Sequence, residues 1–281
     1  VKKTIERCLK EKHTVNYEFM TTSLKNKNIW VQVTLTPVIN DAGKISKLIA
    51  IDSDISKIKE AEKEIQQKSE ELRALAENLQ ETNQALEREK EHTMGSIRYG
   101  LTIQQAILPI KSQMDKYFDS FIIFRPKDIV SGDFYWFSHI PAANKDENDK
   151  VFLAVVDCTG HGVPGAFMSM IGNRLLNEIV NEKGIYEPSE ILTKLNKGVK
   201  VALKQDQTDN NDGMDLCLCR FENTAPDTFD ICYAGAKRPV FYHTDKTTSL
   251  EKLPADRKSI GGVRSKRTTI AFKKKEVTLN S

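Results

Sequence analysis

The chain has 281 residues, of which 39% are hydrophobic and 29% are charged. This composition is typical of a globular protein with one large domain or two smaller ones. The 42 basic and 39 acidic residues leave a net charge of +3. A balance this even argues against nucleic acid or an acidic membrane surface as the partner.

The five cysteines show neither metal-site spacing nor a disulfide framework. Cys217 and Cys219 stand two apart in an apolar run, so on a strand they would share one face and pack as small hydrophobes. These features favour a reducing, cytoplasmic location. No apolar stretch reaches the roughly 18 residues of a membrane span, and no signal peptide is present. Because Val1 lies inside an expected helix, a membrane anchor further upstream stays compatible with the sequence.

Residues 1–56 contain strand-like runs. The clearest run, 29–38, alternates apolar and polar side chains, which predicts a strand with one buried face. Residues 40–43 supply turn formers, and 48–55 is the expected return strand of a hairpin. The strand of Trp30, this turn and the exit motif before the next helix resemble the last strands of a PAS sensor domain.

Residues 57–93 contain neither Pro nor Gly and predict one long helix. Steps of three and four define a seam of Ile58, Ala61, Ile65, Lys68, Leu72, Leu75, Leu79, Thr82, Leu86 and Glu89. This heptad pattern predicts a two-stranded coiled coil and therefore a homodimer. Its polar members would weaken the coil, which suits a signal transmitter with two nearly balanced packings. The alternative is a single charged helix that lies on its own domain.

The next segment, 94–117, is interpreted as a helical lead-in. Gly95 and Gly100 are expected to interrupt the long helix, and a second helical stretch over 101–108 is expected to end at Pro109.

From residue 118 to 281, short strands and Gly-rich turns surround two expected helices, 164–181 and 188–204. Its apolar runs indicate a substantial core, so this region is the candidate catalytic domain.

Three aspartates stand at the ends of expected strands: Asp133, Asp157 and Asp215. A carboxylate in this position is costly to desolvate unless a cation meets it. Three of them on separate strands could converge on metal ions. Oxygen ligands without a His or Cys cluster favour Mg²⁺ or Mn²⁺ over zinc, and a pair of such ions is the centre of many phosphate hydrolases. Turns or helix caps are the alternative role for the three aspartates.

Two long motifs favour the metal interpretation. Residues 125–135 (RPKDIVSGDFY) and 156–166 (VDCTGHGVPGA) resemble the signatures of SpoIIE/RsbU-like phosphatases, the bacterial branch of the PPM (protein phosphatase 2C-like) class. Residues 96–109 resemble the helix that leads into that domain, and 233–241 resemble one of its later strand-turn-strand units. The resemblance implies an α+β chain whose catalytic domain is an α/β-β/α sandwich.

The resemblance also implies a chemistry: two Mn²⁺ or Mg²⁺ ions activate a water that attacks a phosphoserine or phosphothreonine. Asp157 would bridge both ions, the Cys158 carbonyl and Asp133 would hold one of them, and Asp215 would hold the other. His161 would donate a proton to the leaving oxygen or shape the turn. Arg125 or Lys127 would steer the substrate phosphate, and a surface position without this role is the alternative for both residues.

By the same resemblance, the substrate would be phosphoserine on an anti-sigma-factor antagonist. The family has a further metal-binding aspartate, in an Asp-Gly pair, and none of the aspartates after Asp215 precedes a Gly. We therefore expect a truncated domain with weak or no activity. Two alternatives stay open: a sensor histidine kinase fragment, with His92 at its phosphorylation site, and a non-catalytic scaffold with the phosphatase fold.

Overall fold

A computed structural model describes residues 2–23, 26–145, 147–225, 228–244, 249–262 and 271–280. The chain divides into two compact units, Val1–Glu89 and Lys90–Ser281.

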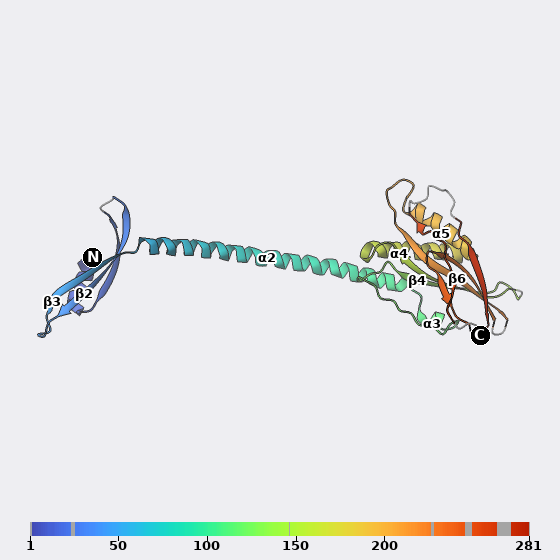
Figure 1. The fold of residues 1–281 in the computed structure, drawn as a ribbon, viewed down its shortest axis with the longest axis horizontal. Coiled ribbons are helices and arrows are strands. Elements are labelled where there is room, and N and C mark those ends of the chain that lie inside the picture. The colour runs from blue at the N-terminus through green and yellow to red at the C-terminus, as the bar shows by residue number, and fades with distance from the viewer. Residues whose placement is uncertain are drawn as a thin grey trace. The chain divides into compact units, whose positions relative to one another are not determined.

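The first unit contains a three-stranded antiparallel sheet in the order β1-β2-β3 (Figure 1). Its elements are α1 (Lys2–Glu11), β1 (Val15–Thr22), β2 (Asn28–Ile39) and β3 (Ile45–Asp54). The predicted hairpin is confirmed, because β2 and β3 pair from Val31 opposite Asp54 onward. The alternation has the expected result: Val31, Val33 and Leu35 are buried and pack in a small core with Cys8 of α1.

Helix α2 spans Ser56–Ile107 without interruption. It begins where the Ser56 N–H donates to the Asp54 carboxylate at 2.9 Å, and this hydrogen bond lowers the pKa of Asp54. The expected interruption at Gly95 and Gly100 is wrong. An isolated Gly costs about 1 kcal/mol relative to Ala, which is too little to end a helix that residues 56–94 have already formed.

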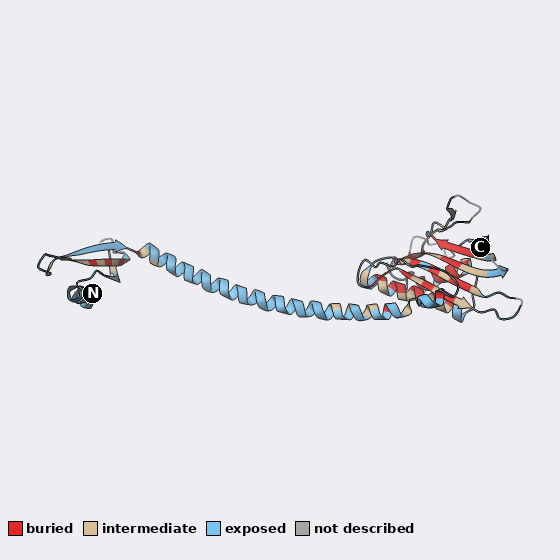
Figure 2. Cartoon of the chain, turned by 90° about the horizontal axis from the view of Figure 1, so that it is seen from below, coloured by how far each residue is buried: buried red, intermediate tan, exposed pale blue. Residues whose placement is uncertain are grey.

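Nearly all of α2 is exposed (Figure 2). The large apolar members of the heptad seam are 57 to 67% exposed: Ile58, Ile65, Leu72, Leu75, Leu79 and Leu86.

The second unit is built on a six-stranded antiparallel sheet in the order β11-β7-β6-β5-β4, with β10 paired to β6. Its strands are β4 (Phe134–Ile140), β5 (Lys150–Cys158), β6 (Gly213–Ala225), β7 (Thr228–Ala236), β10 (Ile260–Gly261) and β11 (Lys274–Asn280). Strands β8 (Val240–Tyr242) and β9 (Glu251–Leu253) form a separate pair. The helices are α3 (Lys111–Met114), α4 (Gly162–Asn177), the π-helix η1 (Glu178–Glu182) and α5 (Pro188–Ala202).

The main core lies between this sheet and the pair α4–α5 (Figure 2). Trp136 and Phe152 of the sheet pack in it with Leu176 of α4 and Leu195 of α5, and all four are at most 2% exposed. Both predicted helices are present, since the turns of η1 continue α4 to residue 182. The mixed α+β class is therefore confirmed.

Cys8, Cys158, Cys217, Cys219 and Cys232 are unpaired. In β6, Cys219 is buried and Cys217 is half-buried. Among the described residues, no helix is long and apolar enough to cross a membrane.

Candidate active site

Asp157 and Asp215 face each other across two neighbouring strands. Asp157 lies near the end of β5 and Asp215 near the start of β6, and the antiparallel register pairs them directly. Side chains in such pairs are close enough to interact, and like charges in these positions destabilise the sheet. The side chains are 45% and 23% exposed respectively. Two half-solvated carboxylates side by side require positive charge nearby.

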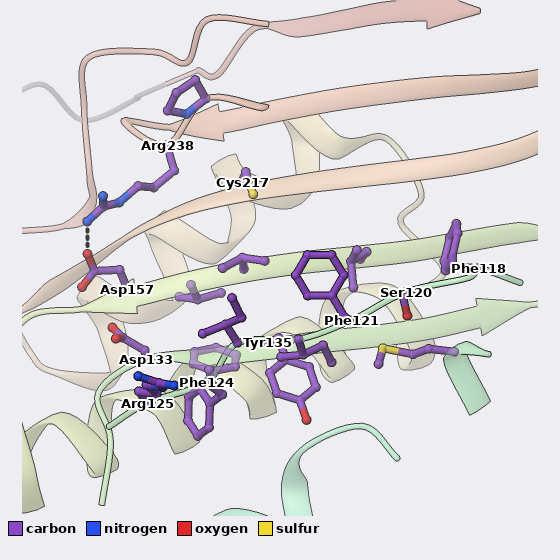
Figure 3. Close-up of a pocket in the computed structure, with 18 residues that line it drawn as sticks. Phe118, Ser120, Phe121, Phe124, Arg125, Asp133, Tyr135, Asp157, Cys217 and Arg238 are labelled. Carbon is purple, nitrogen blue, oxygen red and sulfur yellow. Dashed lines mark hydrogen bonds and ion pairs between the residues drawn. The ribbon is translucent and has the colours of Figure 1, made fainter. Parts of the chain in front are cut away.

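Two consecutive basic residues supply that charge here. The Arg238 guanidinium donates to an Asp157 oxygen (Figure 3), and the Lys237 ammonium lies 3.4 Å from an Asp215 oxygen. Sequence reasoning assigned residues 233–241 to the fold alone and missed this role. The available signal was the position of these two adjacent cations directly after an apolar strand. The motif aspartates also stand at strand ends, so the two sets of charges could meet at one edge of the sheet.

Asp133 approaches the site on a separate loop. A side chain on the preceding Gly132 would place its Cβ 2.7 Å from the Gly160 carbonyl oxygen and 3.4 Å from that of Cys158. On Gly165 of α4, a Cβ would lie 2.9 Å from the Gly132 Cα. These glycines let the loop before Asp133 touch the turn after β5.

The end of α2 holds the same loop. Gln104 is 2% exposed, and its amide nitrogen donates to the Ser131 carbonyl at 2.6 Å and to the Ser169 hydroxyl at 2.9 Å. Its amide oxygen accepts from the Ser131 N–H at 2.9 Å. The Ser131 hydroxyl in turn accepts from the Asp133 N–H at 3.0 Å. The buried Gln104 side chain of α2 is thus connected to Asp133, a candidate metal ligand, through Ser131 alone.

His161 is engaged through both ring nitrogens. Nδ1 lies 2.6 Å from an Asp128 carboxylate oxygen and Nε2 lies 3.1 Å from the Lys127 ammonium. A neutral ring that donates from Nδ1 and accepts at Nε2 satisfies both contacts. The ring therefore connects the loop of the first motif to the turn of the second.

The Cys158 side chain is unsuited to metal binding. Burial, with the negative charge of Asp133 as a second cause, raises the pKa of this thiol to about 12. The thiolate is the form that binds metals, so the backbone carbonyl is the group that Cys158 can offer.

A pocket of about 740 Å³ contains several of these groups. Asp133, Asp157, Arg125 and Arg238 gather at one end of it (Figure 3). Its remaining lining is mainly apolar, and Phe118 lies at the far end.

Within the described ranges, no three His, Cys, Asp or Glu side chains lie close enough together to hold a metal ion. The structure pairs Asp157 with Asp215, and it places Asp133 in the same pocket as Asp157. Lys127 contacts His161 and is not among the residues that line this pocket.

Comparisons with known proteins agree with the motifs. The family described as "Stage II sporulation protein E (SpoIIE)" matches residues 147–280, a range that includes Asp157 and Asp215 but not Asp133. The structure of the SiaA-PP2C domain of Pseudomonas aeruginosa is 27% identical with a TM-score of 0.50, and the match covers 68% of each chain. No curated protein sequence matches the chain.

Two further solved structures are less similar. One, titled "The bacterial stressosome: a modular system that has been adapted to control secondary messenger signaling", is 17% identical, covers 55% of this chain and 65% of its own, and has a TM-score of 0.36. The RsbU and RsbW domains of Rv1364c from Mycobacterium tuberculosis are 20% identical, with coverage of 53% and 36% and a TM-score of 0.35.

The specific motifs, the sheet and helix arrangement, the family match and the SiaA likeness agree. The C-terminal domain therefore contains a match to the SpoIIE family and has the fold of the PP2C-type phosphatase domain of SiaA.

Proposed function

We propose that the second unit hydrolyses phosphoserine or phosphothreonine on a regulatory protein, with two Mn²⁺ or Mg²⁺ ions as cofactors. The observation that carries the proposal is the direct pairing of Asp157 with Asp215, each in contact with a cationic side chain. Bound cations would relieve the repulsion between these two adjacent carboxylates. An aspartate that only forms a turn or caps a helix has no such repulsion to relieve.

The donor groups fit these metals. They are the carboxylates of Asp133, Asp157 and Asp215 and the backbone carbonyl of Cys158, all hard oxygen ligands. Lys237 and Arg238 act as stand-in cations on two of them. In our proposal Asp157 would serve both ions, Asp133 and the Cys158 carbonyl would hold one of them, and Asp215 would hold the other. When bound, the ions would supply a nucleophile at neutral pH and positive charge for the phosphoryl oxygens.

The protein's own residues would orient the substrate. Arg125 lines the pocket beside Asp133, and its planar guanidinium suits a phosphate group. Lys127 would add a second cation from the same loop. Because both nitrogens of His161 are already engaged, we favour an orienting role for this ring, which aims Lys127, over proton donation to the leaving oxygen.

Mn²⁺ titration and phosphate release from a phosphoserine peptide would test the assignment. Asp157→Asn should abolish both Mn²⁺ binding and phosphate release. Asp119→Asn, which removes an exposed carboxylate elsewhere in the unit, should leave both unchanged. A chain that binds Mn²⁺ but releases no phosphate would favour either the non-catalytic scaffold or the weakly active domain that the missing Asp-Gly pair predicts. Equal Mn²⁺ binding by Asp157→Asn and the unchanged chain would refute the metal site.

We further propose that α2 regulates this site as a homodimer. Its seam is exposed and mostly apolar, which is the surface that a partner helix would cover. Gln104 hydrogen-bonds the helix to Ser131, and the Ser131 hydroxyl accepts from the N–H of Asp133. A PAS-like sensor in residues 1–56 would supply the signal.

The proposed partner is a phosphoserine protein of the anti-sigma-factor antagonist type. This choice rests on the motif resemblance. A cytoplasmic location is proposed with it, supported by the unpaired cysteines.

A further inference from the structure

The turn that carries Lys237 and Arg238 is held in an unusual conformation. Lys237 has φ +57°, in the left-handed region that is unfavourable for residues other than glycine. Strain of this kind persists only where surrounding contacts enforce it, and it is frequent at functional sites. The residue is neither a glycine nor an asparagine, so the local sequence does not explain the conformation.

Three hydrogen bonds to the backbone of this turn hold it in place. The Lys237 N–H donates to the Asp256 carbonyl at 2.8 Å, and the Arg238 N–H donates to the Ala236 carbonyl at 2.8 Å. The hydroxyl of Tyr233, which is 1% exposed, donates to the Arg238 carbonyl at 2.6 Å. Burial raises the pKa of Tyr233 above its usual value, so the phenol stays a donor.

The side chains on this rigid backbone make only weak contacts. Lys237 and Arg238 are 49% and 52% exposed and pair with the partly exposed Asp215 and Asp157. An exposed ion pair changes an equilibrium by no more than about fivefold. A divalent cation that binds the same carboxylates would therefore displace both side chains while the backbone of the turn stays in place.

Once displaced, Arg238 would still lie at the end of the pocket that contains Asp133 and Arg125. A guanidinium there can form two parallel hydrogen bonds to phosphate oxygens. We propose that Arg238 is a substrate-phosphate ligand that occupies Asp157 until a divalent cation replaces it. This inference rests on the proposed function, and it adds a phosphate site that the motifs did not indicate.

Two titrations of the full chain test the proposal, one with Mn²⁺ alone and one with inorganic phosphate in saturating Mn²⁺. In Arg238→Ala, Mn²⁺ should bind up to about fivefold more tightly, because its competitor is gone. Phosphate should bind about tenfold or more weakly, because a charge-assisted contact is lost. Arg174→Ala removes the same charge from an arginine bound to Glu182 and should change neither affinity.

Arg238→Lys keeps the positive charge of residue 238 but removes the planar guanidinium. It should keep most of the competition with Mn²⁺ but lose much of the phosphate affinity, because an ammonium lacks the planar fork of donors. If Arg238→Ala matched Arg174→Ala in both titrations while Mn²⁺ still bound, the inference would be overturned and the metal site would stand. If no form of the chain bound Mn²⁺, the proposed function would fail and the inference with it.

Discussion

Replacing Gln104 with Ala tests whether α2 supports the active site. The substitution removes the partners of the Ser131 N–H and carbonyl groups, whereas the Ser169 hydroxyl keeps its bond to the Ala166 carbonyl. A buried polar group without a partner costs about 1–3 kcal/mol, so two such groups should cost about 3 kcal/mol or more. For a unit of this size, a loss of that order lowers Tm by roughly 6–12 °C.

Fluorescence of Trp136 can follow this loss, because Trp136 is buried in the core of the second unit. The adjacent Gln105→Ala is the matched control, since Gln105 is exposed on the same helix. Gln104→Glu keeps the shape but faces the Ser131 carbonyl with an oxygen, so it should destabilise the unit at least as much as Ala does. Equal stability of the Gln104→Ala and Gln105→Ala proteins would refute the reasoning.

The same variant should weaken Mn²⁺ binding, because the Ser131 hydroxyl holds the N–H of Asp133. Gln105→Ala should bind Mn²⁺ normally. A Gln104→Ala protein that is destabilised but has unchanged Mn²⁺ affinity would limit Gln104 to a structural role.

Three other outcomes follow from the structure. Leu79→Asp should convert a dimeric chain to a monomer in sedimentation without changing Mn²⁺ affinity, and a monomeric unmodified chain would contradict the coiled coil. Gly165→Ala should destabilise the second unit by about 1–3 kcal/mol in urea unfolding, since its Cβ would meet backbone atoms. Gly95→Ala, in open space on α2, should instead stabilise the helix by up to about 1 kcal/mol. Burial raises the pKa of Cys158 from 9.0 to about 12 and also raises the pKa of Cys219. Their contribution to stability should therefore be complete below pH 9 and decline as the pH rises towards 12, and pH-dependent urea unfolding with thiol labelling would measure it.

Local patterns in the sequence determined the elements of both units. The alternation of 29–38 predicted a strand whose Val31, Val33 and Leu35 are buried. The helices expected over 164–181 and 188–204 correspond to α4 with η1 and to α5. Gly95 and Gly100 misled the prediction of α2, because a single glycine costs only about 1 kcal/mol in a long helix.

The sequence by itself also determined which aspartates stand at strand ends and which family the motifs resemble. Only the tertiary structure decided that Asp157 and Asp215 are direct partners, because strand register depends on the packing of whole faces against the helices. Only the tertiary structure also identified the partners of Lys237, Arg238 and Gln104. These partners lie 22 to 81 residues away in the sequence. Contacts at such separations arise from the chain's global path, and no local period or motif records them.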